Sequence, residues 1–405
     1  MNFPILGFRV GKSSEMKLLS PIIIEAISRQ LKIFLLCGPN PEKSFPKNIS
    51  QRPIKTNLSF PGQDKVHIVY YQNNNHLVNL LKNNKISDFF SLSFTEKVFE
   101  HYLKKIKKIC KVHYLQATFD YLETDPSVFK QVDRSYMYSQ EMINIYKKAY
   151  PQLDSNILNK FTVVGNPLYD TFSNINKKNI FKKFNFPANK KIVLLMSANM
   201  HTSFWMHYVF SPSNKIKATI RLITKGNIKQ ALYSITEKNY KYLVTNIKKW
   251  CLKNNALLIV KTKSKHKDPS YVKEIADFFF DDSSAWYPFI TLELIVASDL
   301  IICFNYSTSS IDAVAANCPA LQVTIKDPTQ EIKFTDLPVI NSRLYDYHNV
   351  NTIVNHRHLI KLLANKKISD FAIDKKSRHE FISKYLKPLD CKSSHRIIDF
   401  ITKNM

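Results

Sequence analysis

The residues best suited to chemistry follow an apolar segment at 300–304, which has the length and composition of a buried strand. After it come Asn-Tyr-Ser-Thr-Ser-Ser at 305–310, and a short helix is expected at 310–316. Such a turn places hydroxyl groups and unpaired backbone N–H groups at a helix N-terminus, where the helix dipole favours negative charge. One hydroxyl is enough to cap a helix, and this turn carries four. The pattern therefore predicts a phosphate site.

Each side chain of this turn has an expected role. Tyr306 is the one aromatic residue placed to stack on a nucleobase. Asp312 is expected in the first turn of the helix, where its carboxylate would either hold a ribose hydroxyl or only favour the helix dipole. The hydroxyl groups expected to meet the phosphate are those of Ser307, Thr308, Ser309 and Ser310.

The elements that position this turn alternate between strand and helix. An apolar strand at 5–10, an amphipathic helix at 15–29 and a strand at 31–37 form a βαβ unit. Further strands are expected at 66–71, 88–92, 112–116, 135–138 and 161–164, with helices at 94–107 and 140–150. Short strands that alternate with helices predict an α/β fold with a parallel sheet covered on both faces.

A second series of the same kind follows a polar, Lys/Asn-rich stretch at 174–185. It comprises expected strands at 191–197, 256–261, 300–305 and 320–324 and helices at 239–254 and 268–280. The stretch 199–229 is expected to be a long loop or a helical insertion at the mouth of a cleft. We therefore expect two Rossmann-like domains, 1–180 and 181–350, whose sheets face this cleft, and C-terminal helices at 351–405 that pack back across the domains.

The composition restricts the partners and the compartment. The 405 residues carry 59 Lys and Arg against 32 Asp and Glu, a net charge of +27. This charge either reflects AT-rich coding, since Lys, Asn and Ile abound while only 6 Gly are present, or provides a basic face for phosphates or an anionic membrane surface. Nucleic acid is not an expected partner. The six cysteines lie far apart and form no C-x-x-C motif, so we expect neither a zinc site nor a disulfide framework.

No apolar run reaches the ~20 residues that a membrane-spanning helix needs. The expected location is therefore the cytoplasm, with peripheral attachment at the inner face of the cell membrane as an option.

Several short motifs carry a family resemblance. They are the series Val-Val-Gly-Asn-Pro-Leu-Tyr-Asp at 163–170, the segment 257–269, the block Ser-Asp-Leu-Ile-Ile at 298–302 and the ending Cys-Lys-Ser-Ser-His-Arg-Ile at 391–397. Together with the Ser/Thr turn, they resemble bacterial GT-B enzymes of surface-polysaccharide synthesis, namely the capsule-type glycosyltransferases and the polyglycerol-phosphate transferases. The resemblance extends over residues 110–400.

The resemblance implies a first domain that holds the acceptor and a second domain that holds a nucleotide-activated donor. His266 matches the family histidine that contacts the donor phosphates, although Lys267 and Asp268 stand before Pro269 here. No Asp-x-Asp motif stands in a suitable loop, so a metal-independent reaction without a separate cofactor is expected. The cations expected to neutralise the leaving diphosphate are those of Lys261, Lys263 and Lys265.

The first domain departs from the family pattern at one position that matters for catalysis. Where the family carries Gln-His-Gly, this chain has Gln-Ala-Thr at 116–118, so the catalytic base is open. Asp120 lies in the loop past the strand, whereas His113 precedes the strand end and is equally placed to be a core residue; Glu15 is the third candidate. The residues expected on the acceptor side are Lys12, Ser13, Ser14 and Gln116, with helix capping as the alternative role of the two serines.

The expected function is therefore transfer of a sugar or glycerol-phosphate unit from a nucleotide-sugar or CDP-type donor to a surface glycan or lipid-linked acceptor. Two alternatives stay open. One is a sugar-nucleotide 2-epimerase of the same fold, and the other is a catalytically silent, basic binding protein.

Overall fold

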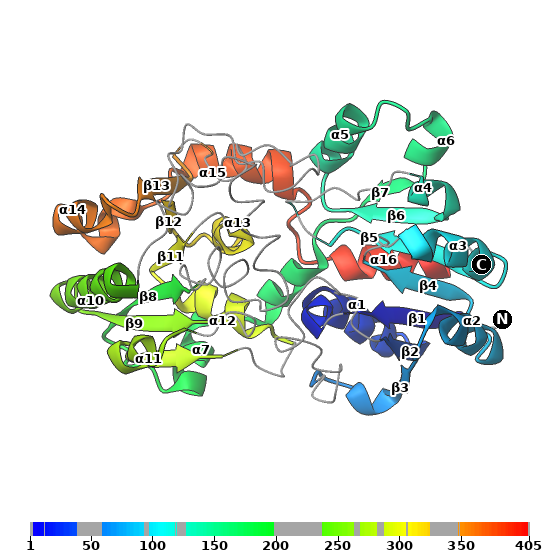
Figure 1. Cartoon of the computed structure of the whole chain (residues 1–405), viewed down its shortest axis with the longest axis horizontal. Helices are drawn as coiled ribbons and strands as arrows, with labels where there is room; N and C mark the ends of the chain where they lie inside the picture. The colour runs from blue at the N-terminus through cyan, green and yellow to red at the C-terminus, as the bar shows by residue number, and fades with distance from the viewer. Residues whose placement is uncertain are drawn as a thin grey trace, which may run out of the picture.

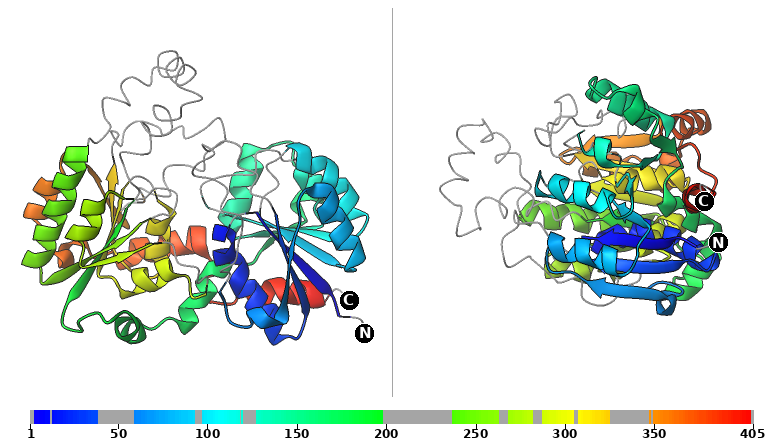
Figure 2. Two further views of the ribbon diagram at one scale, coloured as in Figure 1. Left: turned by 60° about the horizontal axis from the view of Figure 1, so that its bottom comes forward. Right: turned by 90° about the vertical axis from the view of Figure 1, so that its right-hand side faces the viewer.

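The computed structural model describes residues 3–11, 13–38, 59–92, 97–117, 119, 127–197, 237–262, 268–281, 287–304, 307–324, 347 and 349–403. Within them the chain forms two α/β domains, each built on one parallel sheet (Figures 1 and 2). The predicted fold class is thereby confirmed. Among the described residues no helix is long and apolar enough to span a membrane.

The first domain has a seven-stranded sheet in the order β3-β2-β1-β4-β5-β6-β7. All neighbours pair in parallel. The strands are β1 (Ile5–Val10), β2 (Lys32–Cys37), β3 (Val66–Tyr70), β4 (Asp88–Ser91), β5 (Lys111–Leu115), β6 (Arg134–Met137) and β7 (Phe161–Val163). The helices are α1 (Met16–Ser28), α2 (Asn74–Asn83), α3 (Lys97–Lys107), α4 (Val128–Gln131), α5 (Gln140–Ala149) and α6 (Ser155–Leu158), with short 3₁₀ turns η1 (Ser13–Glu15) and η2 (Gln63–Lys65).

The second domain has a six-stranded parallel sheet in the order β10-β9-β8-β11-β12-β13. Separate buried clusters pack against its two faces, as expected for a sheet with helices on both sides. The strands are β8 (Lys191–Met196), β9 (Ala256–Lys261), β10 (Phe278–Phe280), β11 (Leu300–Phe304), β12 (Ala320–Thr324) and β13 (Asn351–Asn355). The helices are α7 (Lys177–Phe184), α10 (Glu237–Lys253), α11 (Ser270–Ile275), α12 (Ile290–Ala297), α13 (Thr308–Ala315) and α14 (Leu359–Ala364).

The helix predicted at 268–280 is wrong in its second half. The helix α11 ends at Ile275, and β10 follows as an edge strand beside β9. Asp277 causes the change, because its carboxylate accepts a 2.7 Å hydrogen bond from the Leu258 N–H while its own N–H donates to the Leu258 carbonyl. These bonds fix the chain to the start of β9.

Between the two sheets, η3 (Pro167–Asn174) and α7 carry the chain from β7 to β8. The polar stretch 174–185, which precedes the second series of strands, mostly forms α7. The predicted boundary at residue 180 falls within this helix, whose Ile180 packs in a second-domain cluster.

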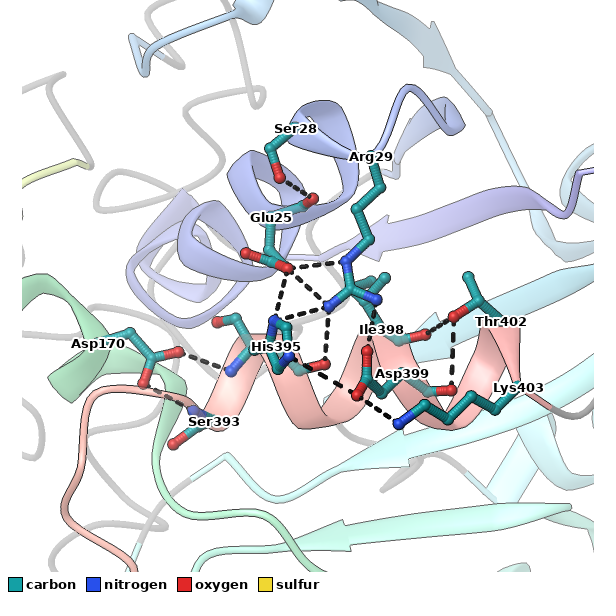
Figure 3. A network of polar contacts seen from close by, with 11 residues as sticks. Glu25, Ser28, Arg29, Asp170, Ser393, His395, Ile398, Asp399, Thr402 and Lys403 are labelled. Carbon is teal, nitrogen blue, oxygen red and sulfur yellow. Dashed lines mark hydrogen bonds and ion pairs between the residues drawn. The ribbon is translucent and has the colours of Figure 1, made fainter.

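The chain ends on the first domain. After η6 (Ile368–Phe371), α15 (Lys375–Phe381) and a π-helical turn (Ile382–Leu386), α16 (Ser393–Thr402) packs against α1. Figure 3 shows the polar contacts between them: Nη1 of Arg29 meets Oδ1 of Asp399 at 2.5 Å, and His395 contacts Glu25. Both ends of the chain therefore lie on the same domain (Figure 1).

The motif at 163–170 and the motif at 391–397 contact each other directly. The carboxylate of Asp170 accepts hydrogen bonds from the backbone N–H groups of Ser393 at 2.9 Å and Ser394 at 2.6 Å, at the start of α16 (Figure 3). Burial raises the pKa of Asp170, and these bonds partly oppose that rise. Gly165 has φ +88° and lies so close to Pro388 and Ser393 that a Cβ atom would clash with both. The contact between the two motifs holds the start of α16 against η3.

Candidate active site

The strand orders locate the ligand-binding edge of each sheet. The order reverses beside β1 in the first sheet and beside β8 in the second. Ligands of open α/β sheets bind outside the carboxyl ends of the strands at such reversal points. The carboxyl ends of both sheets point toward the middle of the molecule (Figure 1). The residues that follow β1, β8 and β11 are therefore the structural candidates for a site.

The N-terminus of α13 has the predicted Ser/Thr turn, and its hydroxyl groups have different partners. Ser307 is the N-cap, and its Oγ accepts a 3.4 Å hydrogen bond from the Ser309 N–H. Ser310 is fully buried, and its Oγ donates to the Ser307 carbonyl at 2.8 Å, so the fold itself uses this hydroxyl. Within the described part of the chain, the hydroxyls of Thr308 and Ser309 have no hydrogen-bond partner. Tyr306 lies outside the described residues.

Asp312 lies in the second turn of α13, not in the first as expected, because the helix begins at Thr308. Its Oδ1 accepts a 2.9 Å hydrogen bond from the hydroxyl of Tyr169 in η3. Burial raises the pKa of Asp312 to about 6, although Lys17 and the Tyr169 hydroxyl oppose that rise. The side chain therefore joins α13 to η3, the segment that leaves the first domain.

The strands beside α13 end in further polar groups. Lys261, the last residue of β9, is buried, and its ammonium group donates to the Thr262 carbonyl. Asp268 accepts hydrogen bonds at one carboxylate oxygen from Ser197, which follows β8, and from Tyr240 of α10 at 3.3 Å. Lys263, Lys265 and His266 lie outside the described residues. Asp268 was not among the predicted site residues, although it stands two residues after His266.

His113 lies in the core of the first domain and not at a ligand-binding edge. Its Nε2 is 2.9 Å from Oδ1 of Asp88, and its ring stacks between Phe90 and Tyr136 at centroid distances of 4.6 and 5.8 Å. Burial alone would raise the pKa of Asp88, but the hydrogen bonds from His113 and Ser87 hold it below its ordinary value. The base role expected for His113 is corrected accordingly, since a buried imidazole that is hydrogen-bonded to Asp88 in mid-strand cannot reach an acceptor.

Glu15 lies where the acceptor side was expected. It is half-buried in η1, just past β1, and its Oε2 accepts a 2.7 Å hydrogen bond from the Gly11 N–H. Ser13 and Ser14 belong to the same 3₁₀ turn, and Ser14 is exposed. Lys12 and Asp120 lie outside the described residues.

Gln116 fastens the ends of two strands together. It is fully buried, its Oε1 accepts a 3.0 Å hydrogen bond from the Tyr138 N–H, and its own N–H donates to the Tyr136 carbonyl. Its amide therefore holds β6 beside β5. The full burial of Gln116 argues against the acceptor contact expected for it.

Arg9 is the main residue at this edge that was not predicted as part of the site. Its Nε donates to the hydroxyl of Tyr71 at 3.0 Å, and its Nη1 lies 3.5 Å from Oγ of Ser91. Tyr71 lies across the end of β2 at Gly38, where a Cβ atom would sit only 2.2 Å from the Tyr71 hydroxyl oxygen. The available signal was a lone arginine inside an otherwise apolar strand. Arg9 and Glu15 thus bring opposite charges to the carboxyl end of β1.

No group of three His, Cys, Asp or Glu side chains that would hold a metal ion occurs among the residues described.

Comparisons with known proteins bear on the fold. No protein-family model matches the sequence, and a search of curated proteins gives no match. Among solved structures, a putative UDP-N-acetylglucosamine 2-epimerase from Listeria monocytogenes is similar with a TM-score of 0.55 and 10% identity, covering 100% of this chain and 97% of that one.

Two transferases are similar to a comparable degree. The Arabidopsis thaliana UGT89C1 complexed with UDP-L-rhamnose has a TM-score of 0.54 and 11% identity, with 100% and 99% coverage. MurG of Acinetobacter baumannii has a TM-score of 0.50 and 9% identity, with 99% and 100% coverage. At such low identity these likenesses establish the fold, so the described residues have the two-domain GT-B architecture.

Proposed function

We propose that the protein is a glycosyltransferase that moves a sugar or glycerol-phosphate unit from a nucleotide-activated donor to a surface glycan or lipid-linked acceptor. The observation that carries the proposal is the N-terminus of α13. It follows the carboxyl end of β11, next to the reversal point at β8, and carries the hydroxyls of the half-buried Thr308 and the buried Ser309. A helix N-terminus with uncommitted hydroxyls is suited to a diphosphate.

The donor diphosphate would meet both this helix and the end of β9. Lys261 supplies a cation there, and Lys263, Lys265 and His266 follow it in sequence. Leaving-group charge would be stabilised by the helix dipole and these cations without a metal ion. Tyr306 is proposed to stack on the base. Asp312 is proposed to act through Tyr169, on the position of α13, instead of on the ribose.

The acceptor would lie against the carboxyl end of the first sheet. A base must deprotonate its hydroxyl, and Glu15 is the described residue placed to do so, next to the strand that carries Arg9. Asp120 remains the second candidate. Lys12, Ser13 and Ser14 are proposed acceptor contacts on the same loop. Transfer to a lipid-linked acceptor would take place at the inner face of the cell membrane.

Calorimetric titration with CMP, CDP, UDP and GDP tests the donor site. The double variant Thr308→Ala/Ser309→Ala should bind the preferred nucleotide at least ten-fold more weakly, because a hydrogen bond to a charged group is worth about 1.5–3 kcal/mol. The control is Ser155→Ala/Thr245→Ala, which removes two hydroxyls on α6 and α10. Equal affinity of the folded double variant and the control would refute the donor site.

A sugar-nucleotide 2-epimerase is the second candidate, because epimerases and transferases match the fold equally well. Incubation with UDP-N-acetylglucosamine distinguishes an epimerase from a transferase and from a binding protein without activity. Conversion to the 2-epimer without an acceptor supports the epimerase, and acceptor-dependent release of nucleotide supports the transferase. Tight nucleotide binding without either reaction supports the silent binding protein.

A further inference from the structure

A pocket of about 930 Å³ lies at the outer end of the second domain. It is formed by the last turns of α10, the segment that follows α14, and the starts of two strands: Lys191 begins β8, and Asn255 precedes β9. Figure 1 shows α10 and α14 at the end of the molecule that faces away from the first domain. The pocket is therefore at the amino-terminal edge of the sheet, opposite the edge that carries α13.

Among the charged residues that line the pocket, lysines prevail. A single carboxylate, that of Asp370, faces them, and it already accepts hydrogen bonds from the Lys367 N–H at 2.8 Å and from the Ser369 hydroxyl. The formal charge of the lining is thus +4, from five lysines and one aspartate. The lysines are Lys191, Lys249, Lys253, Lys366 and Lys367.

These five ammonium groups form no ion pair within the described part of the chain. Lysines elsewhere in the same domain do pair: Lys248 contacts Asp277, and Lys183 meets Glu293 at 2.7 Å. Asp370 is thus the one carboxylate that the described lining sets against five lysines.

Helix dipoles explain only a small part of this charge. The C-termini of α10 and α14 point into the region, and each carries about half an elementary negative charge, so together they balance about one lysine. The remaining excess of about three positive charges is concentrated in a concave site, where low-dielectric walls strengthen its field. A ligand with several negative charges would relieve the repulsion between the lysines.

The walls of the pocket are fixed and offer hydrogen bonds. The indole N–H of Trp250 donates to the Lys366 carbonyl at 2.8 Å, which holds the segment after α14 against α10. Asn246 and Asn365 also line the space, and their side-chain amides donate one N–H each to the carbonyls of Tyr242 and Lys361. The ammonium groups and the second N–H of each amide match the oxygens of phosphates.

We propose that this pocket binds a ligand that carries two or more phosphate groups, at a site separate from that of the donor. The phosphates belong either to a soluble compound or to lipid headgroups. Leu252, which is 62% exposed beside the pocket, would lie against the lipid in the second case.

Two probes distinguish these sources: inorganic tripolyphosphate in calorimetry, and phosphatidylglycerol vesicles in co-sedimentation, both at low ionic strength. The pocket variant is Lys249→Gln/Lys253→Gln/Lys366→Gln. Titrations are repeated in the Thr308→Ala/Ser309→Ala background, so that a phosphate bound at α13 does not contribute. Thermal unfolding checks that each variant is folded.

A control variant removes the same charge elsewhere. It replaces with Gln three exposed lysines on α3, α5 and α7, namely Lys104, Lys147 and Lys178.

If the pocket binds phosphate groups, the pocket variant should bind the probe at least ten-fold more weakly than the control variant does. If tripolyphosphate binds and the pocket variant weakens its binding, the ligand is a soluble compound. If vesicles bind and the pocket variant weakens their binding, but tripolyphosphate does not bind, the ligand is lipid headgroups. Equal losses in the pocket variant and the control would mean that only net charge matters, and would overturn the proposal. Absence of binding to both probes would overturn it as well.

Discussion

The hydroxyl of Tyr169 donates a 2.9 Å hydrogen bond to Oδ1 of Asp312 and so joins two residues 143 positions apart. Tyr169 belongs to η3, which leaves the first domain, and Asp312 belongs to α13, whose N-terminus is the proposed phosphate site. The bond therefore links the position of this helix to that of the first domain. A change in the angle between the domains would be transmitted to the phosphate site through this contact.

The first prediction is a pH-dependent effect of Asp312→Asn on stability. The pKa of Asp312 is about 6 in the folded protein, above its usual 3.8, so protonation favours folding. The wild type should lose stability as the pH rises from about 4 to 6, whereas the variant has no such loss. The variant should therefore match the wild type near pH 4 and exceed it by about 3 kcal/mol at pH 7.

Urea unfolding at several pH values measures this difference. Asn keeps an oxygen that accepts from Tyr169, so the variant isolates the charge. Asp64→Asn, in the exposed turn η2, serves as the control. A difference of constant size across the pH range would contradict the assignment.

The second prediction concerns Arg378, which holds the other end of α13. Its Nε and Nη2 donate to the carbonyls of Val314 and Ala315, both at 2.9 Å. Because these are the last carbonyls of the helix, Arg378→Gln should loosen the position of α13 and weaken nucleotide binding several-fold without any contact to the ligand. Arg396→Gln, which breaks an exposed pair with Asp390, should leave nucleotide affinity unchanged. Similar affinities in both variants would show that α13 does not depend on this contact.

The elements that could be predicted are those that a short, local pattern of residues defines. The strands β1, β9 and β12 have the expected bounds, because each is an apolar run bounded by turn residues. β13 was missed, since only Ile353 and Val354 in it are apolar and its pairing with β12 defines it.

Contacts between residues that lie far apart in the sequence could not be predicted from it. The bonds of Asp170 to Ser393 and Ser394 connect residues 223 and 224 positions apart, and the sequence showed the two motifs without their contact. Arg9 was missed for the same reason, because Tyr71 and Ser91 approach it only through the strand order of the sheet. Both cases depend on topology and not on local pattern.

The third prediction separates a core histidine from a catalytic one. His113→Ala would remove the partner of Oδ1 of Asp88 and leave this buried carboxylate with the hydrogen bond from Ser87, and such a loss at a buried charged group costs about 3 kcal/mol. The free energy of unfolding should fall by such an amount, while the nucleotide affinity of the folded protein stays unchanged. Calorimetry at a temperature where the variant is folded checks the second part. A stable variant with a large loss of turnover would instead restore His113 as a base.

The last prediction tests Glu15 as the general base of the proposed transfer. Glu15→Gln keeps an oxygen that accepts from the Gly11 N–H, so the turn after β1 should persist while the basicity is lost. If Glu15 deprotonates the acceptor, kcat should fall by about 10²–10⁴ while donor affinity is retained, because the donor is proposed to bind to the other domain. Asp120→Asn is measured beside it as the competing candidate, and Glu141→Gln on α5 as a neutral control. Steady-state kinetics with the donor identified by calorimetry decides between them. A near-normal kcat in Glu15→Gln together with a large loss of kcat in Asp120→Asn would identify Asp120, in the loop after β5, as the base. Normal kcat values in both variants would show that neither residue is the base.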